Sequence, residues 1–239
     1  MLGLPDTISA CLFDLDGVLT TTAEVHARAW KEMFDAFLRE RGEPPFQLPR
    51  DYDEYVDGKP RLDGVRAFLA ARGIAADEEL VRTLGDRKNE LVLSLIRSQG
   101  VEVYEGSVRY VKAVRDAGLR RAVVSSSANA REVLRAAGIE DLFEAVVDGI
   151  VAAREGLPGK PAPDMFLAGA RALDTPPPNA AVFEDALAGV QSGHAGHFGR
   201  VVGVDRVGQA DALRKHGADV VVQDLSELLD DRADAGSAA

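Results

Sequence analysis

One apolar segment, ending in two aspartates and a glycine, constrains the fold of this chain more than any other feature. Residues 8–13 are apolar apart from Ser9, and Asp14, Asp16 and Gly17 follow at once. A short apolar run without helical period indicates a buried strand, whose residues i and i+2 point to one side. The two carboxylates should therefore meet at the carboxyl end of a strand, where open α/β sheets bind ligands. The alternative is an ordinary Asp-Gly turn.

Further apolar segments alternate with helical ones from about residue 105 onward. Strands are expected at 121–125, 145–148, 180–185, 200–205 and 218–222, with helices at 129–137 and 163–173 and between the later strands. Apolar strands that alternate with helices predict a parallel sheet covered on both faces. The fold class is therefore α/β, with a Rossmann-like, doubly wound core.

The residues between the first two strands carry only helical patterns. Amphipathic segments are expected at 23–41, 61–72 and 78–99, and the last should bury Leu80, Leu84, Leu91 and Leu95. Such an insertion indicates a helical cap domain above the aspartate pair. We expect a core of residues 1–21 and 101–239 and an inserted cap of residues 22–100.

Composition excludes several functional classes. The net charge is −11, from 39 acidic and 28 basic residues, so no nucleic-acid partner is expected. We expect no signal peptide at the start of the sequence, and no apolar stretch reaches the length that spans a membrane. Its single cysteine, Cys11, is expected to be a buried core residue. We expect a cytoplasmic monomer that contacts no membrane, with a frayed tail at 230–239.

Two segments at expected strand ends could bind phosphate. Residues 125–129 read Ser-Ser-Ser-Ala-Asn before a helix, and hydroxyls with free helix N–H groups form an anion site. Capping by Asn129 with Glu132 is a compatible alternative. Lys160, between residues that precede another helix, could neutralise a phosphate or nearby acids, or it could be a surface lysine.

Glu184 and Asp185 end another apolar strand. Adjacent acids in this position can be a solvated strand end. Together with Asp14 and Asp16 they would supply the oxygen ligands that Mg²⁺ prefers. The sequence therefore predicts a magnesium site at the carboxyl edge of the sheet.

These motifs resemble the haloacid dehalogenase superfamily of phosphotransferases in order and spacing, over most of the chain. The closer similarity is to its β-phosphoglucomutase-like group, which carries a helical cap of the C1 type. The matching segments are residues 20–31 (T-T-T-A-E-V-H-A-R-A-W-K), Gly58-x-x-Arg61, Arg87-Lys88-Asn89 and Ser125-x-Ser127-x-Asn129. Two residues depart from the pattern of the group: Thr21 stands in place of the usual Asp, and Asp57 where Lys is frequent.

The resemblance implies a role for each motif residue. Asp14 is the nucleophile, Asp16 the acid and base, and Mg²⁺ is held by Asp14, the Asp16 carbonyl, Asp185 and Glu184. Ser125 and Lys160 bind the phosphoryl group in transfer. The other phosphate contacts Arg61, Ser127 and Asn129, while the cap and substrate residues are Thr22, His26, Trp30, Gly58 and Lys88. Without the resemblance, Lys88 would be expected to extend to solvent.

The expected activity is magnesium-dependent phosphoryl transfer through an aspartyl phosphate. The enzyme would interconvert β-D-glucose 1-phosphate and glucose 6-phosphate, because two phosphate sites allow a bisphosphate to turn end over end. The alternative is a phosphatase that hydrolyses a small sugar phosphate or nucleotide phosphate. A non-catalytic acidic binding protein is a third interpretation, which four intact motifs disfavour.

Overall fold

The computed structural model describes residues 2–229, so the expected fraying of residues 230–239 lies outside the described part. A single parallel sheet of six strands forms the core, in the order β3-β2-β1-β4-β5-β6. The strands are β1 (Ala10–Phe13), β2 (Arg120–Val124), β3 (Ala145–Val147), β4 (Ala180–Glu184), β5 (Arg200–Val204) and β6 (Val220–Val222). The predicted α/β fold with its parallel sheet is confirmed.

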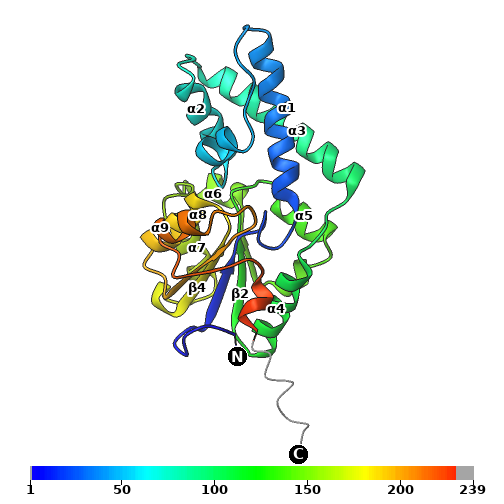
Figure 1. Cartoon of the computed structure of the whole chain (residues 1–239). Coiled ribbons are helices and arrows are strands. Elements are labelled where there is room, and N and C mark those ends of the chain that lie inside the picture. The colour runs from blue at the N-terminus through cyan, green and yellow to red at the C-terminus, as the bar shows by residue number, and fades with distance from the viewer. Residues whose placement is uncertain (1, 230–239) are drawn as a thin grey trace, which may run out of the picture.

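Helices cover both faces of this sheet (Figure 1). One face packs against α4 (Glu105–Asp116) and α5 (Ala130–Ala136). The other packs against α6 (Gly149–Glu155), α7 (Asp164–Ala172), α8 (Leu187–Ala195) and α9 (Ala210–Lys215). Alternation along β1 explains the division, because Cys11 and Phe13 face the first layer and Ala10 and Leu12 the second.

The central strands lie wholly inside the core. All the residues of β1 and β4 are buried, as parallel strands with two covered faces require. Phe13 stacks on Phe183 of the neighbouring strand with ring centroids 4.5 Å apart. Cys11 is fully buried, as expected. This packing holds the carboxyl ends of β1 and β4 at one level, in register from Ala10↔Ala180 to Phe13↔Phe183.

The inserted segment folds above the carboxyl edge of the sheet (Figure 1). It consists of α1 (Thr22–Arg39), a π-helical turn η1 (Tyr52–Val56), α2 (Arg61–Ala71) and α3 (Glu78–Gln99). These elements enclose a hydrophobic cluster of their own, with Trp30, Phe34, Phe46 and Phe68 at its centre. We call this segment the cap. Its boundaries at residues 22 and 100 stay a prediction.

The buried face of α3 differs from the expected one. Leu84 is buried as predicted, but its buried neighbours are Val81, Lys88, Val92 and Ile96, while Leu80, Leu91 and Leu95 are only partly covered. The expected face was therefore wrong by about one residue. The reason is that α3 packs against α1 and α2 and also against the core, so a stripe at spacing i, i+4 turns inward with Lys88 in it.

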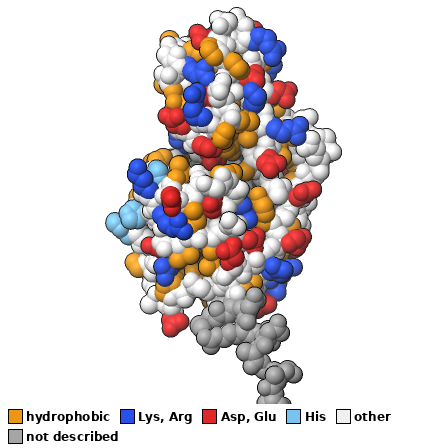
Figure 2. Space-filling view, in the orientation of Figure 1, with side chains coloured by type: hydrophobic (Ala, Val, Ile, Leu, Met, Phe, Trp, Pro, Cys, Tyr) orange, Lys and Arg blue, Asp and Glu red, His pale blue; other side chains and the backbone are white. Residues whose placement is uncertain are grey.

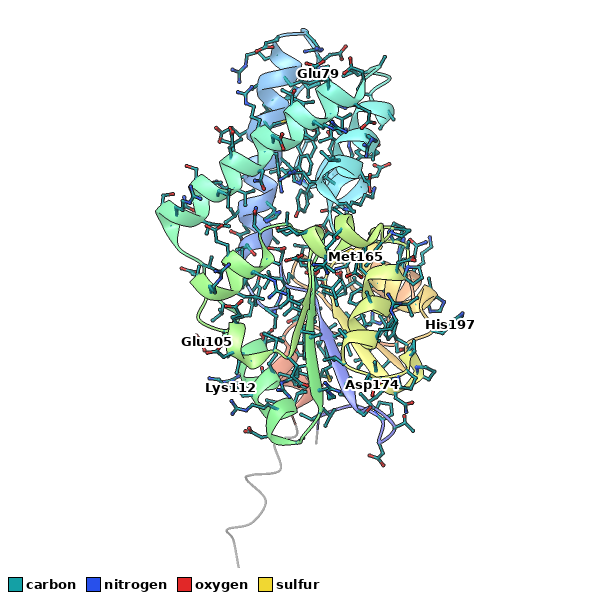
Figure 3. All side chains as sticks on the ribbon, turned by 180° about the vertical axis from the view of Figure 1, so that it is seen from behind. Glu79, Glu105, Lys112, Met165, Asp174 and His197 are labelled. Atoms are coloured by element: carbon teal, nitrogen blue, oxygen red, sulfur yellow. The ribbon has the colours of Figure 1, made fainter. Side chains whose placement is uncertain are left out.

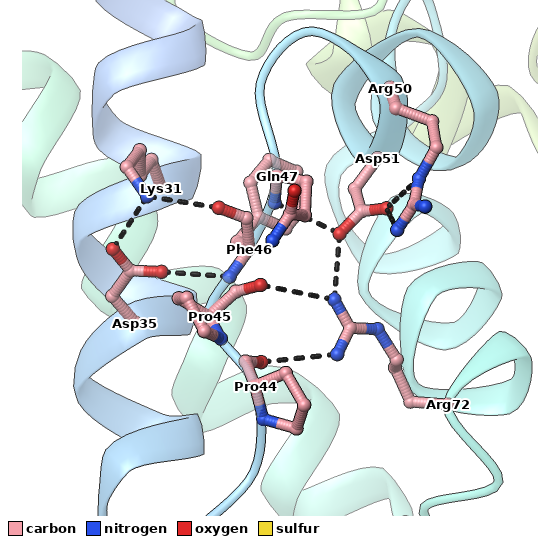
Figure 4. Close-up of polar contacts among 9 residues, drawn as sticks. All are labelled: Lys31, Asp35, Pro44, Pro45, Phe46, Gln47, Arg50, Asp51 and Arg72. Carbon is pink, nitrogen blue, oxygen red and sulfur yellow. Dashed lines mark hydrogen bonds and ion pairs between the residues drawn. The ribbon is translucent and has the colours of Figure 1, made fainter.

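Buried polar contacts hold the loop before η1 (Figure 4). The Asp51 carboxylate is 1% exposed and accepts a hydrogen bond from Arg72 at 2.7 Å. Arg72 also donates to the carbonyls of Pro44 and Pro45. The Phe46 N–H donates to the Asp35 carboxylate at 2.9 Å. These contacts fix where η1 begins and so where the chain re-enters the interface between cap and core.

The surface shows no large field of one sign on the face drawn in Figure 2, where acidic and basic side chains are interspersed. Among residues 2–229, no helix is both long enough and apolar enough to cross a lipid bilayer.

Candidate active site

The two aspartates of the first motif lie in a turn that directly follows β1. The Asp14 N–H donates to the Phe183 carbonyl at 2.9 Å, which extends the pairing of β1 with β4. Gly17 has φ +91°, and a Cβ there would lie 1.8 Å from an Asp185 carboxylate oxygen. Only glycine fits this turn, because it tolerates the positive φ and leaves room for Asp185. Asp14 and Asp16 both line one cavity, as predicted.

Lys160 lies at the centre of the acids. Its ammonium is 2.5 Å from Asp14 Oδ1 and 2.5 Å from Glu184 Oε1, and it donates to the Val124 carbonyl at 3.1 Å. Burial alone would lower the pKa of Lys160, but the two carboxylates raise it above its usual value. Lys160 is 2% exposed, so the surface-lysine alternative is wrong.

Glu184 and Asp185 are part of the same cluster and not a solvated strand end. Glu184 is fully buried and accepts a hydrogen bond from the Ala186 N–H at 2.9 Å. Carboxylate oxygens of Asp14, Glu184 and Asp185 lie within 4.8 Å of one another. Burial raises the pKa of Asp14, against the opposing charge of Lys160. Burial also raises the pKa of Asp185, and neighbouring carboxylates, first Asp57, add to it.

These residues suit a hard divalent cation. Lys160 is hydrogen bonded to Asp14 and Glu184, but no donor among residues 2–229 hydrogen bonds to the Asp185 carboxylate. Buried carboxylates with raised pKa values lack compensating positive charge. A small group of carboxylates that leaves room for waters and a substrate phosphate is the kind of site that binds Mg²⁺. The residues present therefore fit the predicted ion.

The serine-rich loop after β2 faces the acids. Ser125 Oγ lies 3.4 Å from Asp16 Oδ2 and accepts a hydrogen bond from the Ser127 N–H. Ser127 Oγ accepts from the Asn129 N–H. The alternative that the Asn129 side chain caps α5 is wrong, since its amide instead donates to Asn89 Oδ1 of α3 at 2.9 Å. Asn129 therefore links the core to the cap.

Three cap residues lie close to Asp16. Thr22 Oγ1 donates to Asp16 Oδ1 at 2.5 Å, and His26 Nε2 lies 3.6 Å from the same oxygen. The Lys88 ammonium is 2.9 Å from His26 Nδ1. Burial and the charge of Lys88 lower the pKa of His26 to about 4. Burial lowers the pKa of Lys88 to about 7 against the attraction of Asp16.

The other predicted cap residues lie around the same cavity. The Trp30 ring is 4.9 Å from the Lys88 ammonium. Arg61 is 3.3 Å from Asp86, yet its buried Nε has no hydrogen-bond partner among residues 2–229. Gly58 has φ +68° and packs against Ala186. Its carbonyl accepts a hydrogen bond from Ser126 Oγ at 2.8 Å, a contact that sequence motifs did not indicate.

The cavity has a volume of about 570 Å³ and lies between cap and core. Figure 3 shows Met165, one of its lining residues, at this boundary. On the core side of the cavity, Lys160 is hydrogen bonded to Asp14. Asp16 is hydrogen bonded to Ser125 on the same side. The cap side is lined by Arg61, Lys88 and Trp30. Tyr52 also lines it and was missed. No sequence pattern marks Tyr52, because η1 is an irregular turn.

A family model described as haloacid dehalogenase-like hydrolase matches residues 8–197. The chain belongs to this family. Its match with "Beta-phosphoglucomutase" of Mycobacterium tuberculosis is 52% identical and covers 96% of this chain and 94% of that protein. A crystal structure of β-phosphoglucomutase from Clostridium difficile has a TM-score of 0.78 at 28% identity, covering 92% of this chain and 93% of that one. "Hexitol phosphatase A" of Escherichia coli is 28% identical over 91% of each chain.

These similarities confirm three predictions from the sequence. The chain is a member of the haloacid dehalogenase superfamily in its β-phosphoglucomutase-like group. Its core carries the cap expected of that group. This haloacid dehalogenase-like protein is an enzyme of the phosphomutase or phosphatase type.

Proposed function

We propose that this protein transfers a phosphoryl group through an aspartyl phosphate on Asp14 and interconverts β-D-glucose 1-phosphate and glucose 6-phosphate. One observation carries the proposal: a single cavity contains the acid cluster at the core side and Arg61, with an unpaired buried Nε, at the cap side. A half-buried guanidinium whose Nε has no hydrogen-bond partner suits an anion. The cavity could therefore bind one phosphate of a bisphosphate at the acid cluster and the other at Arg61.

Asp14 is the group placed to attack phosphorus. Oδ1 of Asp14 is held by Lys160, and Oδ2 receives no hydrogen bond from residues 2–229. In the first step this oxygen bonds to phosphorus while the bond to the leaving oxygen breaks. Lys160 and Ser125 are positioned to neutralise and bind the phosphoryl oxygens, where the charge of the transition state develops.

Asp16 is the proposed acid and base. Its carboxylate contacts Thr22, Ser125 and, at 3.6 Å, His26, which orient it toward the cavity. Asp16 gives its proton to the leaving sugar oxygen as the acyl phosphate on Asp14 forms. In the second half it takes a proton from the acceptor hydroxyl, which bonds to phosphorus and releases Asp14. Asp16 thereby regains its proton, and the phosphoryl group passes from Asp14 to the sugar.

We propose that Asp14, the Asp16 carbonyl, Asp185 and Glu184 hold Mg²⁺. When bound, the ion would offset the negative charge of the phosphoryl group and of the carboxylates. Arg61, Ser127 and Asn129 would hold the phosphate that does not react. Thr22, His26, Trp30, Gly58 and Lys88 would align the cap with the sugar. The monomeric state and the cytoplasmic location stay predictions.

The proposal is tested by supplying β-D-glucose 1-phosphate with a trace of the 1,6-bisphosphate. Glucose 6-phosphate and free phosphate are followed together, with Mg²⁺ present, after chelation, and after Mg²⁺ is restored. We expect glucose 6-phosphate to form without equivalent free phosphate, and only with Mg²⁺. Free phosphate as the main product would instead identify a phosphatase, which shares the first step and transfers the phosphoryl group to water.

A further inference from the structure

Asp57 places a carboxylate of the cap in the cavity that the core acids also line. It follows η1, and the next residue, Gly58, contacts the core on both sides of the site. The Gly58 carbonyl accepts a hydrogen bond from Ser126, and a Cβ at Gly58 would lie 3.0 Å from the Ala186 Cβ. The residue after Asp57 therefore contacts two core loops, one that contains Ser126 and one that contains Ala186.

The surroundings of Asp57 are acidic. It lines the same cavity as Asp14, Glu184 and Asp185. Burial raises the pKa of Asp57 to about 7, and Glu184 adds to this effect. Among charged neighbours, Asp57 contributes most to the raised pKa of Asp185. Burial also raises the pKa of the Tyr52 hydroxyl beside them, which keeps it a hydrogen-bond donor.

The positive charge next to the core acids, that of Lys160, already pairs with two of them. Lys160 is hydrogen bonded to Asp14 and Glu184, and its charge only partly opposes the effect of burial and of neighbouring carboxylates on the pKa values of Asp57 and Asp185. Like charges brought together in a buried site repel strongly. When Gly58 contacts the core, the carboxylates of Asp57 and Asp185 are therefore held in one cavity, and their repulsion costs free energy.

We propose that Asp57 is a positioning residue that makes closure of the cap depend on a divalent cation in the core acid cluster. The inference rests on the proposed function in one respect, that the cluster binds Mg²⁺. Mg²⁺ keeps several waters when it binds protein, and a carboxylate outside its ligands can accept hydrogen bonds from them. Asp57 is such a carboxylate, since the close oxygen group found among residues 2–229 consists of Asp14, Glu184 and Asp185.

Trp30 reports on closure without substrate or turnover. It is the single tryptophan of the chain, it belongs to the cap, and it lines the cavity. The ring packs in the cap cluster, so opening the cap should bring water only to the part that lines the cavity, and this should move the emission to longer wavelength. The probe is Mg²⁺ alone, titrated into the chelated protein, with binding measured in parallel by calorimetry.

Three proteins are compared: the wild type, Asp57→Asn, and Asp53→Asn as the matched control. Asp53 lies on η1 but does not line the cavity. We expect Mg²⁺ to shift wild-type and Asp53→Asn emission to shorter wavelength. Asp57→Asn should show the short-wavelength emission without Mg²⁺. Because coupling is reciprocal, it should also bind Mg²⁺ about five- to a hundredfold more weakly.

A charge reversal provides a second variant. Asp57→Lys places a cation against Glu184 and Asp185, so the cap should close without Mg²⁺ even if Asp57→Asn folds poorly. The proposal is overturned if Mg²⁺ shifts Trp30 emission equally in the wild type and both Asp57 variants, or if Asp53→Asn behaves like Asp57→Asn. A wild type that binds no Mg²⁺ would overturn the cation site itself. If the wild type binds Mg²⁺ normally and the Asp57 variants behave like it, this inference is overturned while the proposed cation site stands. That result is expected if Asp57 contacts only the sugar.

Discussion

The core and cap halves of the site differ in how far their polar groups satisfy one another. In the core, Lys160 is hydrogen bonded to Asp14, Glu184 and the Val124 carbonyl, and Glu184 accepts from Ala186. In the cap, the buried nitrogens His26 Nε2 and Arg61 Nε have no hydrogen-bond partner among residues 2–229. The pKa values of His26 and Lys88 are lowered by burial to about 4 and about 7.

The two halves therefore lack different ligands: the core carboxylates lack a cation, and the buried cap nitrogens lack an anion. The core acids are placed by buried strands and by each other, so their geometry exists before substrate arrives. Unpaired buried donors in the cap cost free energy, which an anion in the cavity would recover. The comparison indicates that the core determines the chemistry and that the cap determines which molecule stays bound for it.

The strongest test of the comparison is Asp14→Asn. It removes the proposed nucleophile but keeps the shape of the side chain, so turnover should fall by at least about a thousandfold. The fold should survive, since the change also removes one charge from a crowded cluster. Turnover and the thermal midpoint are measured together, with Asp116→Asn on the exposed face of α4 as the control. Turnover near the wild-type rate, with contaminating enzyme excluded, would refute the covalent mechanism.

Arg61→Ala removes the cap end of the site and leaves the core intact. A charge-assisted contact is worth about 1.5–3 kcal/mol, so mutase flux should fall about ten- to a hundredfold. Hydrolysis of acetyl phosphate, which has no second phosphate, should change little. Arg41→Ala, in an exposed part of the cap outside the cavity, serves as the control. Equal large losses of both activities would show that Arg61 supports the fold or the reacting phosphate, and unchanged mutase flux would remove the second phosphate site.

Lys88→Met should separate stability from activity in the cap. The folded-state pKa of Lys88 is about 7, below the value of about 10.4 for an exposed lysine. Between these values the unfolded chain holds the proton and the folded chain does not, so wild-type stability rises with pH across this window. At pH 6 the wild type holds a buried charge that the variant lacks. The free energy of unfolding of Lys88→Met should therefore be on the order of 2 kcal/mol higher than that of the wild type.

That advantage should shrink as pH rises from about 7 to about 10.4, where both states of the wild type become neutral. Denaturant unfolding in the presence of a chelator measures it, and turnover should fall in the same protein. Lys112→Met on the exposed face of α4 is the control, at the far end of the core from the cap (Figure 3). A constant difference at all pH values would mean that Lys88 is protonated alike in both states.

The smallest effect is expected for Arg97→Gln. Arg97 of α3 lies 3.8 Å from Glu132 of α5, and the two side chains are 68% and 44% exposed. An exposed pair of this kind contributes less than about 1 kcal/mol, even though it joins cap and core. Unfolding free energy and mutase flux should therefore stay close to the wild type. A large change in flux would show that contacts at the surface, and not only groups in the cavity, control the cap.

Much of the core could be predicted because its signals are local. The strand that precedes Asp14 was expected from an apolar run, and it begins within two residues of the predicted start. The expected helices at 129–137 and 163–173 are α5 and α7. Helix α6 was not predicted, although Asp148 accepts a hydrogen bond from the Val151 N–H and Gly156 follows the helix with φ +63°. An N-cap aspartate and a glycine after the last turn would have indicated it.

The sequence by itself determined the α/β class, the four motifs at the ends of strands and the helical insertion, because each depends on periodicity or on neighbouring residues. Only the tertiary structure decided which face of α3 turns inward, that Asn129 pairs with Asn89, and that Asp57 lines the same cavity as the core acids. These outcomes depend on how the cap packs on the core. A residue on a helix or an irregular turn acquires its partners from elements that are distant in the chain, and local spacing carries no record of them.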